Sequence, residues 1–416
     1  MSSKQFVDKD ESVGFFVYQL LTNYYFAFLF PISYYDLMKQ NHSRGLRTWI
    51  EVDTKAVKHN YDVFRNLISK KIKLMAVVKS NAYGHSLIDF SREMEKLGAD
   101  FLGVDSITEA LALRKEGIAL PILVLGYTLP EMIALASEAD ISLTVSTFES
   151  LSAIQKAHLK RPLKIHIKVD TGMHRQGFLA EDLPKILGEL KVSSEKLKVG
   201  GLFTHFASAK NPAFPKDTGN QIREFSKWIE TFKKAGLKPI IHASATSGAM
   251  IFPKAHFDMV RVGIGLYGLW PAKEVQAFLS DKIELKPAMA WKTIISEIKK
   301  VSKGERVGYD LTETLDRDSI VAVCPVGYWH GFRRALSSVG RVLVRGKSAK
   351  ILGRVSMDML TIDITRVLGA KVGDEITIIG KDGRETITAE DIGSLSDTSA
   401  YEIITTINPL IKKIYI

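Results

Sequence analysis

The chain has 416 residues, with 57 Lys+Arg against 46 Asp+Glu and a formal net charge of +11. A hydrophobic content of 46% and a charged content of 25% are ordinary globular values, which exclude disordered, collagen-like and low-complexity chains. The length predicts either two domains or one large α/β barrel with a smaller unit. The basic residues form no dense run with interleaved aromatics, so we expect no nucleic-acid partner.

Cys324 is the only cysteine, which rules out an intrachain disulfide. A disulfide-free chain favours a reducing compartment, and we expect a cytoplasmic protein in which Cys324 is an inert buried thiol. No cluster of Cys and His has the spacing of a zinc site, so we expect no bound metal.

The N-terminal segment needs a separate interpretation, because residues 12–35 carry no charge and are rich in Phe, Tyr and Leu. The stretch is long enough for a membrane-spanning helix, but Gln19, Thr22 and Asn23 lie in its middle. Three interpretations stay open for residues 1–46: a mis-called start before Met38, a membrane anchor, or a loosely packed extension. We expect no membrane contact and expect residues 1–37 to be dispensable for catalysis.

Between Lys73 and Gly268, short apolar runs alternate with helical patterns. In the stretch 221–234, Ile222, Phe225 and Phe232 recur at helical spacing. Eight strand-like runs alternating with helices predict parallel βαβ units and, by their number, a closed (β/α)8 TIM-type barrel. An open doubly wound sheet is the alternative, but the Gly-rich first turn typical of it is missing. The expected strands are residues 74–78, 101–104, 122–125, 141–145, 163–169, 200–205, 240–243 and 257–262.

Beyond Glu284 the pattern changes to short β-rich runs separated by glycines, which predicts a C-terminal antiparallel β domain. The strand-like run Thr48–Val52 has no place among the eight barrel strands, and we expect it to pair with the C-terminal domain. The predicted division is therefore an extension over 1–46, a barrel over 47–280 and a β domain over 281–416.

Two loops at the predicted barrel mouth have the composition of a phosphate site. Loops after the seventh and eighth strands of such barrels often bind phosphate through backbone N–H groups. The hydroxyls and glycines there suit close backbone approach, although ordinary turns use the same residues. The residues concerned are Thr246, Ser247, Gly248, Gly263 and Gly265.

Lys79 closes the first predicted strand and faces these loops across the barrel mouth. Many lysines at strand ends are merely solvated. However, a lysine amine opposite a phosphate site is also the arrangement that a pyridoxal phosphate Schiff base requires.

The run from Ala76 to His85, Ala-Val-Val-Lys-Ser-Asn-Ala-Tyr-Gly-His, closely resembles the cofactor-lysine motif of bacterial alanine racemases. The similarity extends in order from about Arg47 to the C-terminus. It implies a fold-type III enzyme with pyridoxal 5'-phosphate as cofactor and a barrel followed by a β domain. It also implies a homodimer in which each active site is completed by the partner's β domain. Further matching stretches are 168–175, 204–207, 257–261, 325–328, 353–358 and 401–402.

The same resemblance assigns the chemistry to named residues. Lys79 would hold the cofactor and act as one racemising base, and Tyr309 of the partner subunit would be the opposite base. Arg261 matches the partner of the pyridine nitrogen, and an arginine, with its ordinary pKa above ~12, does not hand its proton to the ring. His205 would bridge Arg261 and Tyr309, and Lys168 matches a lysine that is often carbamylated.

The remaining binding residues also follow from the resemblance. Arg175 matches the residue that contacts the cofactor phenolate and the substrate carboxylate, and Met357 matches one whose backbone N–H meets that carboxylate. The residues that match the family's phosphate set are Tyr83, Ser247, Gly263, Ile264 and Tyr401.

The chain departs from the usual family pattern near the substrate entrance. It has Thr246-Ser247 for Asn-Ser, Ser356-Met357-Asp358 for Cys-Met-Asp and Trp329-His330 for Ala-Asp. The tyrosine lies in Gly308-Tyr309-Asp310, where Ser-Tyr-Gly or Gly-Tyr-Gly is common. Side-chain tolerance is the property that these changes would affect.

The resemblance implies interconversion of L-alanine and D-alanine, which supplies D-alanine for peptidoglycan. A racemase of broader specificity, or a serine racemase, is the alternative on the same scaffold. A non-catalytic pyridoxal phosphate carrier would resemble the barrel alone, and a pyridoxal phosphate decarboxylase would lack the tyrosine base.

Overall fold

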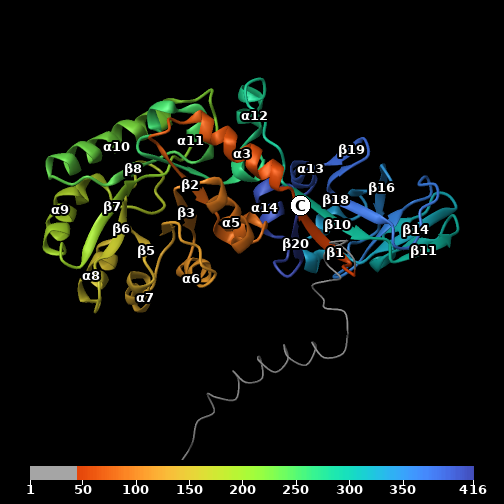
Figure 1. Ribbon diagram of the computed structural model, residues 1–416. Helices are drawn as coiled ribbons and strands as arrows, with labels where there is room; N and C mark the ends of the chain where they lie inside the picture. Colours follow the sequence, from red (N-terminus) through yellow and green to blue (C-terminus); the bar gives the residue numbers. More distant parts are fainter. Residues whose placement is uncertain (1–44) are drawn as a thin grey trace, which may run out of the picture. The chain divides into compact units, whose positions relative to one another are not determined.

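The computed structural model describes residues 45–416 (Figure 1). The interpretations of the uncharged N-terminal stretch fall on residues 1–44, which lie outside the described residues. From residue 45 onward, no helix combines the length and the hydrophobicity needed to cross a membrane.

The first part of the described chain is a closed barrel of eight parallel strands, which confirms the predicted (β/α)8 architecture. The spatial order of the strands follows the chain, and the last strand pairs back with the first, Met259 lying opposite Lys73. The predicted strand ends are right to within three residues. The strands are β2 (Lys73–Val77), β3 (Phe101–Val104), β4 (Ile122–Val124), β5 (Ile141–Val145), β6 (Leu163–Lys168), β7 (Leu197–Phe203), β8 (Ile240–His242) and β9 (Met259–Val262).

Helices connect successive barrel strands and cover the outside of the barrel (Figure 1). In the longest of them Phe225 and Phe232 are buried as predicted, but the buried face is centred on Trp228, which leaves Ile222 and Ile229 only partly buried. The helices are α5 (Leu87–Leu97), α6 (Ile107–Lys115), α7 (Ile133–Glu138), α8 (Phe148–Lys156), α9 (Leu183–Val192), α10 (Lys216–Lys234) and α11 (Thr246–Ile251).

The inside of the barrel is partly polar. On β6, Ile165 and Ile167 belong to the large apolar core outside the barrel, so the alternation of strand side chains turns His166 and Lys168 inward. The interior also holds a small apolar cluster that is separate from the large core. Its members are Met75, Phe101, Leu123 and Met259.

The C-terminal part is one mostly antiparallel sheet in the order β11-β14-β17-β16-β15-β18-β10-β1-β20, with β19 beside β18. Two helices of this part are α13 (Ala389–Leu395) and α14 (Ala400–Thr405), and α12 (Lys273–Leu279) precedes the sheet. The strands are β10 (Met289–Ile294), β11 (Glu297–Val301), β14 (Ser319–Cys324), β15 (Arg341–Val344), β16 (Lys347–Leu352), β17 (Leu360–Asp363), β18 (Glu375–Asp382), β19 (Glu385–Ile387) and β20 (Lys412–Tyr415).

β1 (Thr48–Val52) belongs to this C-terminal sheet, where it pairs antiparallel with β10 and parallel with β20. The parallel pair with β20 is an exception to the antiparallel pattern that the sequence predicted. Asp53 then caps the helix α3 (Thr54–Leu67), its carboxylate accepting the N–H groups of Lys55 and Ala56. The chain therefore passes at Asp53 from the β domain to the helix that packs on the barrel.

Candidate active site

A cavity of about 810 Å³ opens at the carboxyl ends of the barrel strands. This is the end at which barrels of this type place their functional residues. Ten of the twelve residues that the family resemblance assigns to the site line this cavity. Those lining it are Lys79, Tyr83, Lys168, Arg175, His205, Ser247, Arg261, Gly263, Ile264 and Tyr401.

Lys79 begins α4 (Lys79–Tyr83), a left-handed turn at the end of β2. The φ angles of residues 80–83 lie between 50° and 56°, although none of these residues is glycine. Left-handed backbone costs an L-residue about 1–2 kcal/mol. The turn is held by Asn81, whose N–H donates to Glu109 (3.3 Å) and whose side-chain oxygen accepts the N–H of Leu87 (2.9 Å). The surrounding contacts thus maintain a strained segment at the cavity wall.

Asp105 contacts Lys79 directly and was missed by the sequence analysis. The Nζ atom of Lys79 donates to Oδ1 of Asp105 at 2.9 Å. The N–H of Asp105 donates in turn to Oε2 of Glu109 (2.8 Å), and the other oxygen of Glu109 accepts from Asn81. Glu109 therefore links the turn that carries Lys79 to the residue that contacts it. The sequence signal that could have identified Asp105 was its position immediately after β3, at the barrel mouth.

Arg261 lies inside the barrel and all its partners are neutral groups. Its NH2 group donates to the carbonyls of Thr204 (2.9 Å) and Ala243 (2.7 Å) and to Nδ1 of His205 (3.2 Å). Its NH1 group donates to Nδ1 of His242 (3.0 Å). Burial lowers the pKa of Arg261 to about 9. The guanidinium is therefore easier to deprotonate than its ordinary value suggests, yet it stays charged at neutral pH.

His166 and His242 extend this network and were also missed by the sequence analysis. Nε2 of His242 lies 2.9 Å from Nδ1 of His166. Burial, followed by the charge of Arg261, lowers the pKa of His166 to about 3 and that of His242 well below its ordinary value. Since Arg261 only donates, the neutral ring of His242 accepts at Nδ1 and donates from Nε2 to His166. A Cβ at Gly201 would lie 2.1 Å from the His166 ring, so the glycine makes room for it.

His205 accepts from Arg261 through Nδ1, so its hydrogen is on Nε2. Burial, followed by the charges of Arg261 and Arg175, lowers the pKa of His205 to about 3. His205 is thus a neutral neighbour of Arg261, and the positive charge of this contact is on the guanidinium.

Lys168 and Arg175 approach the cavity from the end of β6 and the turn after it. Nζ of Lys168 donates to Oε1 of Gln176 at 2.7 Å. Burial, followed by the charge of Arg175, lowers the pKa of Lys168 to about 8, which raises the fraction of neutral amine that carbamylation needs. Asp170 shapes the turn, because its carboxylate accepts the N–H groups of Met173 (2.9 Å) and Arg175 (3.0 Å).

The two loops expected to bind phosphate meet on the opposite side of the cavity. The N–H of Gly263 donates to Oγ1 of Thr246 at 3.1 Å. A Cβ at Gly263 would lie 2.7 Å from the hydroxyl of Tyr83, so only glycine leaves Tyr83 in place. Burial, followed by the charge of Asp105, raises the pKa of Tyr83 to about 12, and burial also raises that of Tyr401. Both phenols therefore keep a hydrogen that they can donate to an anion.

Gly265 does not lie in the cavity lining, which corrects the interpretation of this residue as a phosphate-site glycine. A Cβ at this position would lie 2.3 Å from the ring of Phe64, a buried residue of α3. Gly265 therefore serves the packing of α3 on the barrel, a long-range contact that the local sequence does not reveal.

The charges around the cavity suit an anionic ligand. Among the lining residues of the described chain, five side chains are cationic and only Asp105 is acidic. Lys210, which the sequence analysis did not single out, lies at the edge with its Nζ 4.9 Å from the centre of the Tyr401 ring. The five cationic residues are Lys79, Lys168, Arg175, Lys210 and Arg261.

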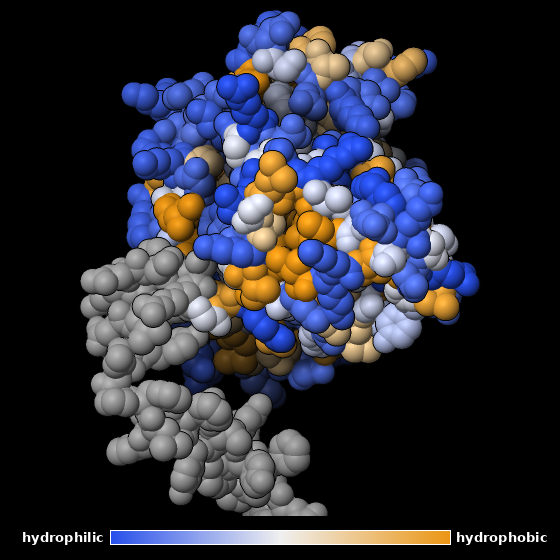
Figure 2. Space-filling model, turned by 90° about the vertical axis from the view of Figure 1, so that its right-hand side faces the viewer, coloured by the Kyte–Doolittle hydropathy of each residue, from blue (hydrophilic) through white to orange (hydrophobic). Residues whose placement is uncertain are grey.

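Tyr309 and Met357 do not join the other expected site residues. Both belong to the β domain and are 69% and 55% exposed, respectively, and neither lines the cavity of its own chain. Further exposed apolar side chains of this domain include Leu311 and Trp329. Figure 2, which faces the β domain, shows hydrophobic residues gathered on its surface. The two residues therefore lie exposed on the β domain, apart from the cavity of their own chain.

Two family models match the chain in succession. The model described as "Alanine racemase, N-terminal domain" matches residues 52–271, and "Alanine racemase, C-terminal domain" matches residues 288–415. An alanine racemase from Methanococcus maripaludis is 39% identical over 375 residues, covering 88% of this chain and 98% of that protein.

Solved structures agree with the sequence matches. An alanine racemase from Clostridium difficile 630 has a TM-score of 0.84 and 33% identity, covering 89% of this chain and 96% of that one. The alanine racemase from Bacillus anthracis with bound L-Ala-P also has a TM-score of 0.84, with 35% identity over 89% of this chain and 95% of that one.

Proposed function

Because the chain belongs to the alanine racemase family and is an amino-acid racemase, we propose that it interconverts L-alanine and D-alanine with two bases on opposite faces. Lys79 is one base and Tyr309 of a second copy of the chain is the other. The observation that carries this proposal is the division of the site residues: ten line one cavity, while Tyr309 and Met357 are exposed on the β domain.

The cavity fits pyridoxal 5'-phosphate as the cofactor. The cationic lining favours a phosphate-bearing ligand, and the missing side chain of Gly263 leaves room for the hydroxyl of Tyr83 beside the loop. Lys79 supplies the amine for covalent attachment, and Arg261 is the partner of the ring nitrogen. When bound, the cofactor withdraws electrons from the α-carbon of an amino acid and makes its hydrogen acidic. The phosphate would be held by Tyr83, Ser247, Gly263, Ile264 and Tyr401.

Arg261 controls the protonation of the ring nitrogen of the cofactor. With a pKa of about 9 and four acceptors that fix its direction, it donates a hydrogen bond at neutral pH and keeps its protons. Neutral His205 holds one of its nitrogens in place. By keeping its protons, Arg261 would leave the ring nitrogen unprotonated, which would favour fast return of the proton to the α-carbon.

Substrate binding and proton transfer are divided between two chains. Arg175 of the barrel and the backbone N–H of Met357 from the partner subunit bind the substrate carboxylate. Racemisation removes a proton from one face of the α-carbon and returns one to the other, and a single rigid side chain does not reach both faces. Lys79 on the barrel wall and Tyr309 of the partner subunit serve these two faces.

A mixing experiment tests the shared site. Lys79→Ala and Tyr309→Phe should each lower kcat by at least ~100-fold, a typical general-base contribution. After subunit exchange, each heterodimer should contain one site with both bases, so mixing the two inactive variants should restore activity. Failure of rescue, with exchange verified by mass spectrometry of the dimers, would show that both bases come from one chain.

We also place the reaction in the cytoplasm as a source of D-alanine for peptidoglycan. Growth of a bacterium that requires D-alanine should be restored by this chain. Assays of other L-amino acids, serine included, separate this function from a racemase of broader specificity: alanine should be the preferred substrate.

A further inference from the structure

Tyr309 lies at the tip of a small hairpin. β12 (Arg306–Val307) and β13 (Glu313–Thr314) pair antiparallel, with Val307 opposite Glu313, and residues 308–312 form the tip between them. The tip is sharply bent: the φ angles of Gly308, Asp310 and Leu311 are 83°, 59° and 51°. A two-residue strand pair is too short to hold such a tip rigidly by its own hydrogen bonds. The direction of Tyr309 must therefore be fixed by contacts outside the hairpin.

The base of the hairpin is held by apolar packing. Leu315, Val321 and Leu352 form a small buried cluster that is separate from the main core, and Val307 packs against it. This cluster attaches both ends of the hairpin to β14 and β16. It fixes where the hairpin begins but does not reach the tip.

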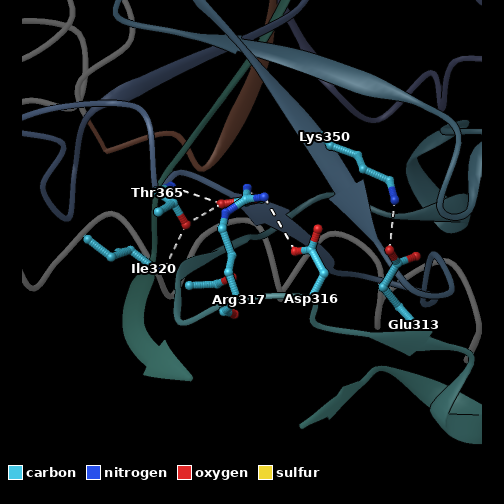
Figure 3. Close-up of polar contacts among 8 residues, drawn as sticks. Glu313, Asp316, Arg317, Ile320, Lys350 and Thr365 are labelled. Atoms are coloured by element: carbon cyan, nitrogen blue, oxygen red, sulfur yellow. Dashed lines mark hydrogen bonds and ion pairs between the residues drawn. The ribbon is translucent and has the colours of Figure 1, made fainter. Parts of the chain in front are cut away.

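Glu313 is a largely buried polar anchor at the end of the hairpin (Figure 3). Its Oε1 accepts a hydrogen bond from Nζ of Lys350, on β16, at 2.7 Å, and its side chain is only 14% exposed, against 54% for Lys350. Burial acts to raise the pKa of Glu313, but hydrogen bonds from Lys350, Ser338 and the N–H of Gly353 hold it below its ordinary value. The carboxylate is thus ionised and accepts a hydrogen bond from Lys350, with Ser338 and the N–H of Gly353 close by.

The tip itself contacts the segment that leads to Met357. Oδ2 of Asp310 lies 2.7 Å from Nε of Arg354, an ion pair without the alignment of a hydrogen bond. The backbones also touch, since a Cβ at Gly353 would lie 2.5 Å from the carbonyl oxygen of Val307. Glu313 and this contact therefore join the hairpin of Tyr309 to the segment of Met357.

The chain leaving the hairpin is tethered separately. Arg317 forms an ion pair with Asp363 at 2.5 Å, and Asp363 accepts the N–H of Thr365 at 2.9 Å. Oγ1 of Thr365 accepts the N–H of Ile320 at 2.9 Å. This tether fixes the exit of the hairpin onto β14.

From these contacts we infer that Glu313, with Lys350, is a positioning residue for the proton transfer made by Tyr309. It holds the hairpin of Tyr309 and the segment of Met357 as one unit, so that the base and the carboxylate-binding N–H enter the partner's cavity in a fixed relation. The inference rests on the proposed function, in which Tyr309 serves one face of the substrate.

The test compares Glu313→Ala, Glu313→Gln and Lys350→Met in the holoenzyme. Displacement of a reacting group by about 1 Å can cost 10²-fold, so Glu313→Ala should lower kcat by roughly 10- to 100-fold. Glu313→Gln keeps the acceptor for Ser338 and Gly353 and should lose less than about threefold by the same reasoning. In ²H₂O, the alanine variant should exchange the α-hydrogen of the two enantiomers unequally, in the same sense as Tyr309→Phe. Cofactor absorbance and dimer mass should be unchanged.

Lys350 is half exposed, so Lys350→Met provides a second test of the positioning role if Glu313→Ala fails to fold. Lys347→Met is the matched control, an exposed lysine on the same strand, and should leave kcat and exchange unchanged. Equal exchange of the α-hydrogen of the two enantiomers in the Glu313 and Lys350 variants would overturn the positioning role, provided that Tyr309→Phe still shows unequal exchange. If Tyr309→Phe exchanges both enantiomers equally, the base assignment itself fails and the positioning role fails with it.

Discussion

Gly263 is the residue at which the absence of a side chain matters most to the site. Its N–H ties the loop after β9 to Thr246, and the space of its missing Cβ is occupied by the hydroxyl of Tyr83. Tyr83 is partly buried and packs on Tyr267, their ring centres 4.8 Å apart, which limits its movement. A single methyl group at this position therefore displaces part of the phosphate site.

We expect Gly263→Ala to weaken cofactor retention by at least tenfold, since the new Cβ would lie 2.7 Å from Tyr83 and overpacking costs about 1–3 kcal/mol. Dialysis followed by visible absorbance measures the retained cofactor. Gly219→Ala on α10 is the control, because only the end of the Arg223 side chain lies near its missing Cβ, and it should retain the cofactor normally. Full retention in Gly263→Ala would show that Tyr83 can move.

For single residues, the sequence analysis relied on residue type and on place in a motif. It therefore found the site residues whose chemistry is recognisable from the sequence. It missed Asp105, His166 and His242, whose importance depends on which strand ends and inward positions meet in the barrel. It misread Gly265, because the residue that occupies the space there, Phe64, comes from a helix 201 residues earlier in the chain. Contacts of this kind are determined by tertiary packing, which local patterns do not contain.

Among the elements, the left-handed turn after β2 combines strain with function. Four consecutive residues with positive φ present Lys79 and Tyr83 to the same cavity. The turn looks like an ordinary strand-to-helix connection in the sequence, because it contains no glycine and only Asn81 is of a type that often adopts positive φ. The sequence therefore predicted where Lys79 lies but not the backbone that holds it.

Replacing Ser80 by glycine should relieve part of this strain. The free energy of unfolding should rise by about 1 kcal/mol, since glycine adopts this φ without penalty. Activity should fall, because a more mobile turn no longer fixes Lys79. Thermal unfolding and kcat measure the two effects, and Ser150→Gly in α8 should instead lower stability. A Ser80→Gly protein that is less stable would show that the turn is not strained.

The assignment of β1 to the C-terminal domain was made by exclusion. Its five residues read as a strand, and the eight barrel positions were already filled. Its partners β10 and β20 could not be read from the pattern, because register between distant strands is set by the assembled sheet.

For the whole molecule, the buried histidines make stability depend on acidity. An ordinary histidine titrates near 6.5, whereas burial lowers the pKa of His85 to about 4 and, together with the charge of Arg261, those of His166 and His205 to about 3. Between these values the unfolded chain binds protons that the folded chain does not. Stability from this source is fully present above pH 6.5 and is lost as the pH falls toward 3.

We therefore expect the free energy of unfolding to fall below pH 6.5 by about 1.4 kcal/mol per pH unit for each such histidine. Denaturant unfolding across this range measures the slope. His85→Gln should reduce the slope, while His158→Gln, at an exposed position, should leave it unchanged. A slope equal in the wild type and His85→Gln would show that His85 is not the source.

The pairing of β1 with β20 has a consequence for how the protein is made. Residues 73–262 contain every strand of the barrel, so the barrel can close while the ribosome is still translating the β domain. β1 has no such early partner: the hydroxyl of Thr54 just after it bonds the carbonyl of Ile416, 362 residues later. β1 is synthesised early, and its Trp49, Ile50 and Val52 are buried in the finished sheet. It must therefore remain unpaired until its partner strands have been synthesised. During synthesis its apolar side chains therefore stay exposed until the β domain emerges.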